Sequence, residues 1–212
     1  SDAPINETTS DDRYLGFEVD CIDNWQVVSV VSRAMRNGVG PTSKGSSIKR
    51  GAPDVYVDNN GAITGALSTS MLKDVGVEVV LTGHSERRHV IGESDVLINA
   101  KTRAALKAGF EVILCIGEKI EQREAGQTDA INAAQTYYGL AGVSADQMSK
   151  VTIAYEPVWA IGTGKTATDA DAQSAHAAIR KVLGAMYGDA IAQATRIQYG
   201  GSVKPGNAPD LM

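Results

Sequence analysis

One carboxylate, Glu156, follows directly after a short apolar run and precedes a segment that carries two glycines. The run, Val151–Tyr155, predicts a buried strand, and Pro157 fixes the backbone just after the carboxylate. The glycines, Gly162 and Gly164, predict a loop. This order of elements can place a general base beneath a lid. Taken alone, the same pattern also fits an ordinary surface turn.

Polar residues also follow the other apolar runs of the chain. Leu81 precedes the string Thr-Gly-His84-Ser-Glu-Arg-Arg, Ile116 precedes Gly-Glu118, and Gln198 precedes Tyr-Gly-Gly-Ser202. In a parallel sheet the carboxyl ends of all strands open at one edge, and barrel enzymes carry their catalytic groups there. The sequence therefore predicts that these polar side chains meet at one face of the fold.

Short apolar runs alternate with amphipathic stretches from Ile48 onward, which predicts βα units in a parallel sheet. Strands are expected at Val77–Leu81, Val112–Ile116, Val151–Tyr155 and Arg196–Tyr199, with a weaker one at Ile48–Ala52. Their continuous apolar character indicates that both faces of the sheet are covered. Periodicity leaves open a closed barrel and a doubly wound sheet. No Gly-x-Gly-x-x-Gly string follows an early strand, which counts against the dinucleotide-binding fold.

Helices are predicted in the intervals between the later runs. One covers Asp95–Ala108, with Ser94 as its N-cap and Gly109 as its end. Leu97, Ala100 and Ala104 are expected on its apolar face. The others cover Asp129–Tyr138, and Ala170–Tyr187 with Thr168 or Asp169 as its cap.

Composition narrows the class of protein. The chain has 212 residues, 43% of them apolar, which is enough for one good core and short for two domains. Its net charge is −5 and it has no basic run, which makes nucleic acid an unsuitable partner. No apolar stretch reaches the roughly 18 residues of a membrane span. Its two cysteines, Cys21 and Cys115, lie far apart, and Cys115 stands in an apolar run, so we expect a buried thiol and a cytoplasmic protein.

At these strings the chain resembles the triosephosphate isomerase family. The matching strings are Gly83–Arg88, Leu114–Glu118, Ala154–Lys165, Tyr199–Lys204 and Gly61–Gly65. The resemblance implies an α/β fold of the TIM (β/α)8-barrel type, incomplete in this chain. We expect a single domain over residues 1–212, in which 1–47 is an unmatched segment and 48–212 is the matching isomerase region.

The resemblance implies an isomerase of glycolysis and gluconeogenesis, which interconverts dihydroxyacetone phosphate and glyceraldehyde 3-phosphate through an enediolate. Glu156 would remove the substrate proton, and desolvation under a lid would strengthen it as a base. His84 would donate a hydrogen bond as neutral imidazole, a tuning for which this family is itself the standard example. No cofactor or metal is implied. His89 and His176 lie outside the matching strings and are interpreted as structural or solvated.

The resemblance also assigns residues around the catalytic pair. Gly162 and Ser202 resemble phosphate contacts, and a loop around Thr64 resembles the one that enters a partner subunit, which implies a homodimer. The lid and the residues next to it would include Ile161, Thr163, Tyr199 and Glu86, with hinges at Pro157–Trp159 and Lys165–Ala167.

The chain departs from the family pattern at three places. The family's first strand ends in Asn-x-Lys, whereas Asn24-Trp25-Gln26 has glutamine at that position, and Glu86 would then lie unpaired near the missing lysine. Ala66 replaces a glutamate that would meet Arg87 across the dimer interface. The eighth strand and its glycine pair are not found. We expect residues 1–47 to supply two strands, and a partial or misread copy of a longer gene explains the pattern most simply.

Two other functions stay open from the sequence. One is a catalytically impaired fragment or pseudoenzyme that binds phosphorylated ligands or partners through the retained lid. The other is a different phosphate-binding barrel enzyme, which the length of the Ala154–Lys165 match disfavours.

The departures predict negligible isomerase turnover for the 212-residue chain in a coupled assay with both triose phosphates. Loss of one preorganised donor to a developing oxyanion costs about a hundredfold to a thousandfold, and loss of a full positive charge should cost at least as much. Turnover close to that of a full-length relative would contradict this expectation. It would mean that another residue, such as Lys44 or Lys49, supplies the charge.

Overall fold

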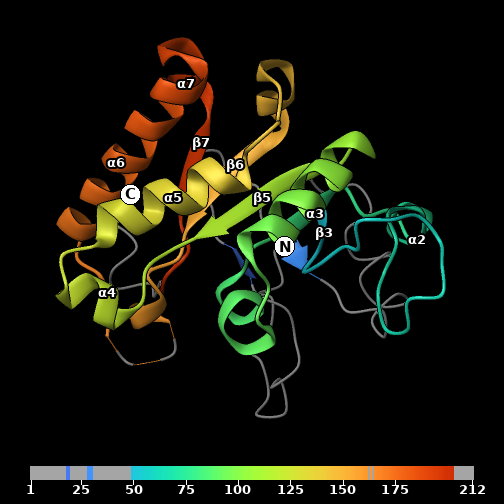
Figure 1. The fold of residues 1–212 in the computed structure, drawn as a ribbon, viewed down its shortest axis with the longest axis horizontal. Coiled ribbons are helices and arrows are strands. Elements are labelled where there is room, and N and C mark those ends of the chain that lie inside the picture. The colour runs from blue at the N-terminus through green and yellow to red at the C-terminus, as the bar shows by residue number, and fades with distance from the viewer. Residues whose placement is uncertain (1–17, 20–27, 31–48, 162, 164, 203–212) are drawn as a thin grey trace, which may run out of the picture.

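The computed structural model describes residues 18–19, 28–30, 49–161, 163 and 165–202, which form one sheet with helices packed against it (Figure 1). The sheet has seven strands that pair in sequence order. The strands are β1 (Glu18–Val19), β2 (Val28–Val30), β3 (Lys49–Ala52), β4 (Val79–Thr82), β5 (Glu111–Ile116), β6 (Val151–Tyr155) and β7 (Arg196–Tyr199). All neighbouring pairs from β2 to β7 are parallel, and β1 pairs antiparallel with β2.

The sequential strand order decides between the two architectures that the sequence left open. A doubly wound sheet reverses its strand order at a switch point and carries helices on both faces. Here each strand of the described chain pairs with the strand next to it in sequence. Helix α3 packs on β4 and β5, α5 on β5, and α6 on β6 and β7, in the same order as the strands (Figure 1). This is the TIM-barrel type of arrangement.

The two faces of the sheet belong to different apolar clusters, as the two-residue period of a strand requires. Residues such as Val80, Leu114 and Ile153 face the helices and form the main core. The alternate positions form a second cluster on the opposite face. Its members are Val79, Leu81, Ile113, Cys115 and Ala154. Both faces are therefore buried, in agreement with the continuous apolar runs in the sequence.

The helix after β4 has the predicted ends but not the predicted buried face. Helix α3 covers Asp95–Lys107, and the Ser94 hydroxyl accepts a hydrogen bond from the Leu97 amide at 3.3 Å. Gly109 follows with a φ of 92°, a left-handed conformation that ends the helix. The buried residues are Ile98, Lys101, Thr102, Ala105 and Leu106. Leu97, Ala100 and Ala104, expected on the apolar face, are half-buried, and Lys101 and Thr102 are buried through polar contacts that apolar periodicity does not register.

Helix α6 covers Asp169–Tyr187, and Thr168 is its cap. The Thr168 hydroxyl accepts from the Asp171 amide at 3.1 Å, while the Asp171 carboxylate accepts from the Thr168 amide at 3.1 Å. This reciprocal pair is a capping box. The other helical elements are α2 (Thr69–Asp74), η2 (Arg87–Ile91), α4 (Ile120–Glu124), α5 (Thr128–Gly139), η3 (Ala145–Lys150), η4 (Val158–Ala160) and α7 (Asp189–Ala194). None of the helices in the described ranges combines the length and apolar character that crossing a membrane requires.

The segment before residue 48 contributes strands β1 and β2 to the sheet, which confirms the expectation of two further strands there. The antiparallel direction of β1 was not expected. At the start of β3, Lys49 forms an ion pair with Glu111 at 2.5 Å. Glu111 is the first residue of β5, so this pair lies at the amino end of the parallel strands. The charge of Lys49 is therefore paired at the end of the sheet opposite the carboxyl ends of the strands.

Candidate active site

Glu156 lies directly after β6 and is almost fully buried, with 5% of its surface exposed. Its backbone amide donates to the Ile116 carbonyl at 2.7 Å, which fixes the residue against the end of β5. Its carboxylate Oε2 accepts from the Ser85 amide at 3.1 Å, and Oε1 lies 3.4 Å from His84 Nε2. The structure thus brings together the ends of β4, β5 and β6 around one carboxylate.

The hydrogen bonds of His84 assign its tautomer. His84 follows β4 and is buried, with 7% exposure. Its Nδ1 accepts a hydrogen bond from the Glu86 backbone amide at 3.3 Å. An imidazole nitrogen that accepts carries no proton, so in the neutral ring the proton is on Nε2. That N–H faces the Glu156 carboxylate, and it can serve as a donor to a polar group placed between the two residues.

Burial makes the Glu156 carboxylate more basic than an ordinary glutamate. Desolvation raises the pKa of Glu156, and His84, the Ser85 amide and the Cys115 thiol oppose that rise only in part. The same burial, together with the neighbouring Glu156 carboxylate, raises the pKa of the Cys115 thiol well above its usual range. Cys115 is therefore a neutral, buried thiol, as the sequence predicted. Cys21 lies outside the described residues.

Arg88 joins the ends of β4 and β5 near Glu156 and His84. Its Nε donates to the Gly83 carbonyl at 2.6 Å, and its guanidinium also donates to the Cys115 carbonyl at 3.1 Å. Asp95, the first residue of α3, accepts from the same guanidinium at 2.6 Å. One side chain thereby connects the residues that carry His84 to the strand that supports Glu156.

The backbone after Glu156 is held by a buried carboxylate, Glu118, that has no exposed surface. Glu118 accepts from the Tyr155 hydroxyl at 3.1 Å and from Trp159 Nε1 at 2.9 Å. The Arg123 guanidinium lies over the Trp159 ring, 4.5 Å from its centroid, and pairs with Asp171. These contacts fix the first of the two predicted hinges, Pro157–Trp159.

The predicted phosphate and lid residues are placed in part. The Ser202 hydroxyl donates to the Ala160 carbonyl at 2.8 Å, which joins the segment after β7 to the start of the predicted lid. Tyr199 is buried with 3% exposure, and Ala167 in the second hinge is also buried. The Thr163 hydroxyl donates to the Trp159 carbonyl at 2.7 Å. Ile161 is half-buried, while Gly162 and Gly164 lie outside the described residues.

The structure also places three further residues that the sequence singled out, Glu86, Thr64 and Lys49. Glu86 is exposed, so its carboxylate is solvated rather than unpaired in a buried site, and its backbone amide donates to His84. Thr64 is exposed on the loop before α2. Lys49 lies at the amino end of the strands, opposite the site, and therefore cannot supply the expected positive charge. Gln26 and Lys44 lie outside the described residues.

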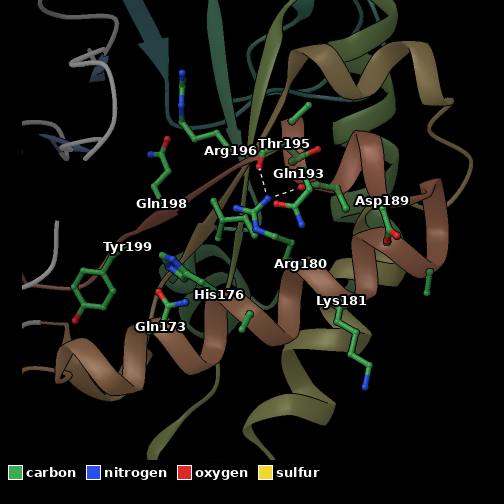
Figure 2. Close-up of a pocket in the computed structure, with 16 residues that line it drawn as sticks. Gln173, His176, Arg180, Lys181, Asp189, Gln193, Thr195, Arg196, Gln198 and Tyr199 are labelled. Atoms are coloured by element: carbon green, nitrogen blue, oxygen red, sulfur yellow. Dashed lines mark hydrogen bonds between the residues drawn. The ribbon is translucent and has the colours of Figure 1, made fainter.

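A large hollow lies elsewhere on the molecule. A cavity of about 810 Å³ lies between α6, α7 and β7, and its lining includes His176, Arg180 and Gln198 (Figure 2). Arg180 donates to the Thr195 carbonyl at 3.1 Å and is therefore tied to the backbone beside β7. Neither Glu156 nor His84 lines this cavity. Of the predicted site residues, Tyr199 does line it.

Sequence reasoning missed the contributions of Ser85, Arg88 and Cys115 to the site. The Ser85 contact comes from the backbone amide, which no side-chain pattern reveals. Arg88 stands inside the matching string, and that position was the available signal. Among the described residues, no three His, Cys, Asp or Glu side chains gather closely enough to hold a metal ion.

Comparison with known proteins decides the family. The sequence profile described as triosephosphate isomerase matches residues 22–212. The chain belongs to the triosephosphate isomerase family. It is 54% identical over 174 residues to the triosephosphate isomerase of Treponema denticola, covering 82% of this chain and 70% of the relative. It is 53% identical over 169 residues to that of a Roseiflexus species, covering 80% and 66%, and 48% identical over 203 residues to that of Carboxydothermus hydrogenoformans, covering 93% and 81%.

Membership of the triosephosphate isomerase family confirms the resemblance that the sequence strings carried. It also confirms the barrel-type fold and an isomerase as the class of enzyme. The three relatives all carry the name of the isomerase, and none of these comparisons favours a pseudoenzyme that only binds phosphorylated ligands.

The buried carboxylate predicts a pH-dependent gain of stability in the variant Glu156→Gln. Burial raises the pKa of Glu156 in the folded protein above its value in the unfolded chain. The protonated carboxyl group therefore stabilises the fold at pH values below the unfolded-state pKa, and this stabilisation is lost as the pH rises through the folded-state pKa. Gln cannot ionise, so the variant should exceed the wild type in free energy of unfolding at neutral pH. Denaturant unfolding between about pH 4 and about pH 8 should show the difference growing with pH.

The matched control is Glu124→Gln, which removes an equal charge from an exposed position on α4. Its unfolding midpoint should stay close to that of the wild type at each pH. A Glu156→Gln protein that is less stable than the wild type at neutral pH would contradict the assigned environment.

Proposed function

We propose that this chain interconverts dihydroxyacetone phosphate and glyceraldehyde 3-phosphate, with Glu156 as the base. The observation that carries the proposal is the buried Glu156 carboxylate, 3.4 Å from the Nε2 of His84 at the carboxyl ends of the strands. The reaction moves a proton between adjacent carbon atoms, and it needs a base at carbon and a hydrogen-bond donor at oxygen. These two side chains supply the two groups.

Glu156 takes the proton from the substrate carbon and returns it to the neighbouring carbon. Its raised pKa strengthens it as a base, since the cost of keeping its charge buried is relieved when it accepts a proton. His84 donates its Nε2 hydrogen to the oxygen of the enediolate, which carries the developing charge. The hydroxyl group on the neighbouring carbon returns a proton to Nε2, so the ring ends neutral, and the Glu86 amide that donates to Nδ1 leaves Nε2 as the nitrogen that carries this proton.

The phosphate group would lie on the other side of the mouth, between the lid and the segment after β7. The family resemblance assigns Gly162 and Ser202 to it, and backbone amides suit a dianion. The hydrogen bond from Ser202 to the Ala160 carbonyl supports this placement, because it brings that segment against the start of the lid.

We also infer a cytoplasmic homodimer. The loop around Thr64 is exposed, as a loop that enters a partner subunit must be in the isolated chain. Large apolar side chains are exposed at Ile63 on the same loop and at Met71 on α2, as well as at Val90, Ile91 and Val96. Arg87 pairs with Asp54 at 3.0 Å and with Glu93 at 2.6 Å, so it is neutralised within its own chain although Ala66 replaces the glutamate of the family pattern.

The proposal predicts that Glu156→Gln removes exchange of the carbon-bound substrate proton. Nuclear magnetic resonance in deuterium oxide at high protein concentration follows this exchange even where turnover in a coupled assay is negligible. The variant should lose about a hundredfold to ten-thousandfold of the rate, the usual contribution of a positioned general base.

Glu124→Gln is again the control and should exchange at the wild-type rate. Exchange that proceeds unchanged in Glu156→Gln would show that Glu156 is not the base. Exchange by the wild type that does not exceed the buffer rate would contradict the proposed function as a whole.

A further inference from the structure

Two glycines flank Glu156 from the neighbouring strands. Gly117 follows β5, and a Cβ atom built on it would lie 1.7 Å from the carbonyl oxygen of Glu156. Gly200 follows β7, and a Cβ atom there would lie 2.9 Å from Cγ of Glu156. Both distances are shorter than any normal carbon contact. The candidate base therefore occupies a gap that exists only because neither neighbour has a side chain.

Backbone conformation does not explain the two glycines. Neither Gly117 nor Gly200 is among the glycines with positive φ, whereas Gly83 and Gly109 are. An alanine could adopt the backbone angles of both positions. The requirement for glycine is therefore one of space beside Glu156.

Hydrogen bonds hold both glycines in place, so neither can simply move away. The amide of Gly117 donates to Gln135 Oε1 at 2.8 Å, and the carbonyl of Gly117 accepts from Gln135 Nε2 at 3.3 Å. The amide of Gly200 donates to the Tyr155 carbonyl at 2.7 Å. A side chain at position 200 would therefore displace Glu156 rather than the strand end.

We propose that Gly117 and Gly200 are positioning residues for the isomerisation, and that they set the place of the Glu156 carboxylate relative to His84. The inference rests on the proposed role of Glu156 as the base. Gly117 leaves room for the backbone of Glu156. Gly200 leaves room for the Cγ atom of Glu156 and thereby determines the direction of the carboxylate. Within the gap the carboxylate reaches both the Ser85 amide and His84 Nε2.

Gly200→Ala tests the proposal, because the added methyl group meets a side-chain atom of Glu156 and leaves the nearest backbone atom, the Tyr155 carbonyl oxygen, at an ordinary 3.4 Å. A misplacement of about 1 Å can cost about a hundredfold in rate. We expect the maximal rate of substrate proton exchange to fall by about tenfold to a hundredfold, with the half-saturating substrate concentration changed by less than about twofold. Gly117→Ala meets backbone at 1.7 Å and should destabilise the fold as well.

The matched control is Gly184→Ala on α6, where the added methyl group meets only the flexible Asp189 side chain at 3.2 Å and Ala192 Cβ at 3.9 Å. It should keep the wild-type rate. A second readout does not depend on activity, since the carbon-13 resonance of the Glu156 carboxyl group should shift in Gly200→Ala and stay unchanged in Gly184→Ala.

The outcomes separate this inference from the proposed function. If Glu156→Gln leaves exchange unchanged, the role of the base fails whatever Gly200→Ala does. If Glu156→Gln removes exchange but Gly200→Ala matches Gly184→Ala in rate and in the Glu156 resonance, the positioning role is overturned. A Gly200→Ala protein that does not fold also overturns it, because Gly200 would then support the sheet and not the base.

Discussion

The Glu156 side chain is almost fully shielded from water, and it adds a buried carboxylate to a chain whose net charge is already negative. Burial of a carboxylate costs free energy, and a buried carboxylate is retained only where surrounding groups bind it and fix its position. Here the Ser85 amide and His84 Nε2 meet the two oxygens, and the ends of β5 and β7 hold the backbone on either side. The same desolvation raises the pKa of Glu156, and this is the direction that the proposed proton abstraction requires.

The sheet makes this placement possible because its neighbouring strands from β2 to β7 are parallel and follow one another in order. Strands β4, β5, β6 and β7 therefore end at the same edge, and the residues directly after them meet although they are far apart in the chain. Arg88 joins the first two of these ends through carbonyl groups of Gly83 and Cys115. Glu118 fixes the third through Tyr155 and Trp159. The rigidity of the site thus comes from buried charged side chains that bind backbone and aromatic partners.

The sequence allowed much of this to be predicted. Short apolar runs located β5, β6 and β7 within a residue. Ser94 located the start of α3, and the start predicted for α6, with Thr168 or Asp169 as its cap, was one residue late. The matching strings placed Glu156 and His84 at strand ends, where the structure brings them together.

Other features could not be predicted, for physical reasons. The tautomer of His84 depends on the Glu86 backbone amide, and the orientation of the Glu156 carboxylate depends on the Ser85 amide and on the absence of two Cβ atoms. The sequence shows the two glycines, but it does not show that they lie beside Glu156 or which backbone amides reach a side chain. The buried face of α3 was missed for a related reason, since Lys101 is buried through ion pairs with Asp54 and Glu93.

Whether Glu156 is a desolvated base can be measured by titrating its carboxyl group with carbon-13 nuclear magnetic resonance, with the resonance assigned through Glu156→Gln. Burial predicts a titration midpoint above the ordinary glutamate value of about 4.3. A midpoint at or below that value would show that the carboxylate is solvated or strongly paired, and it would contradict the description of Glu156 as a desolvated base.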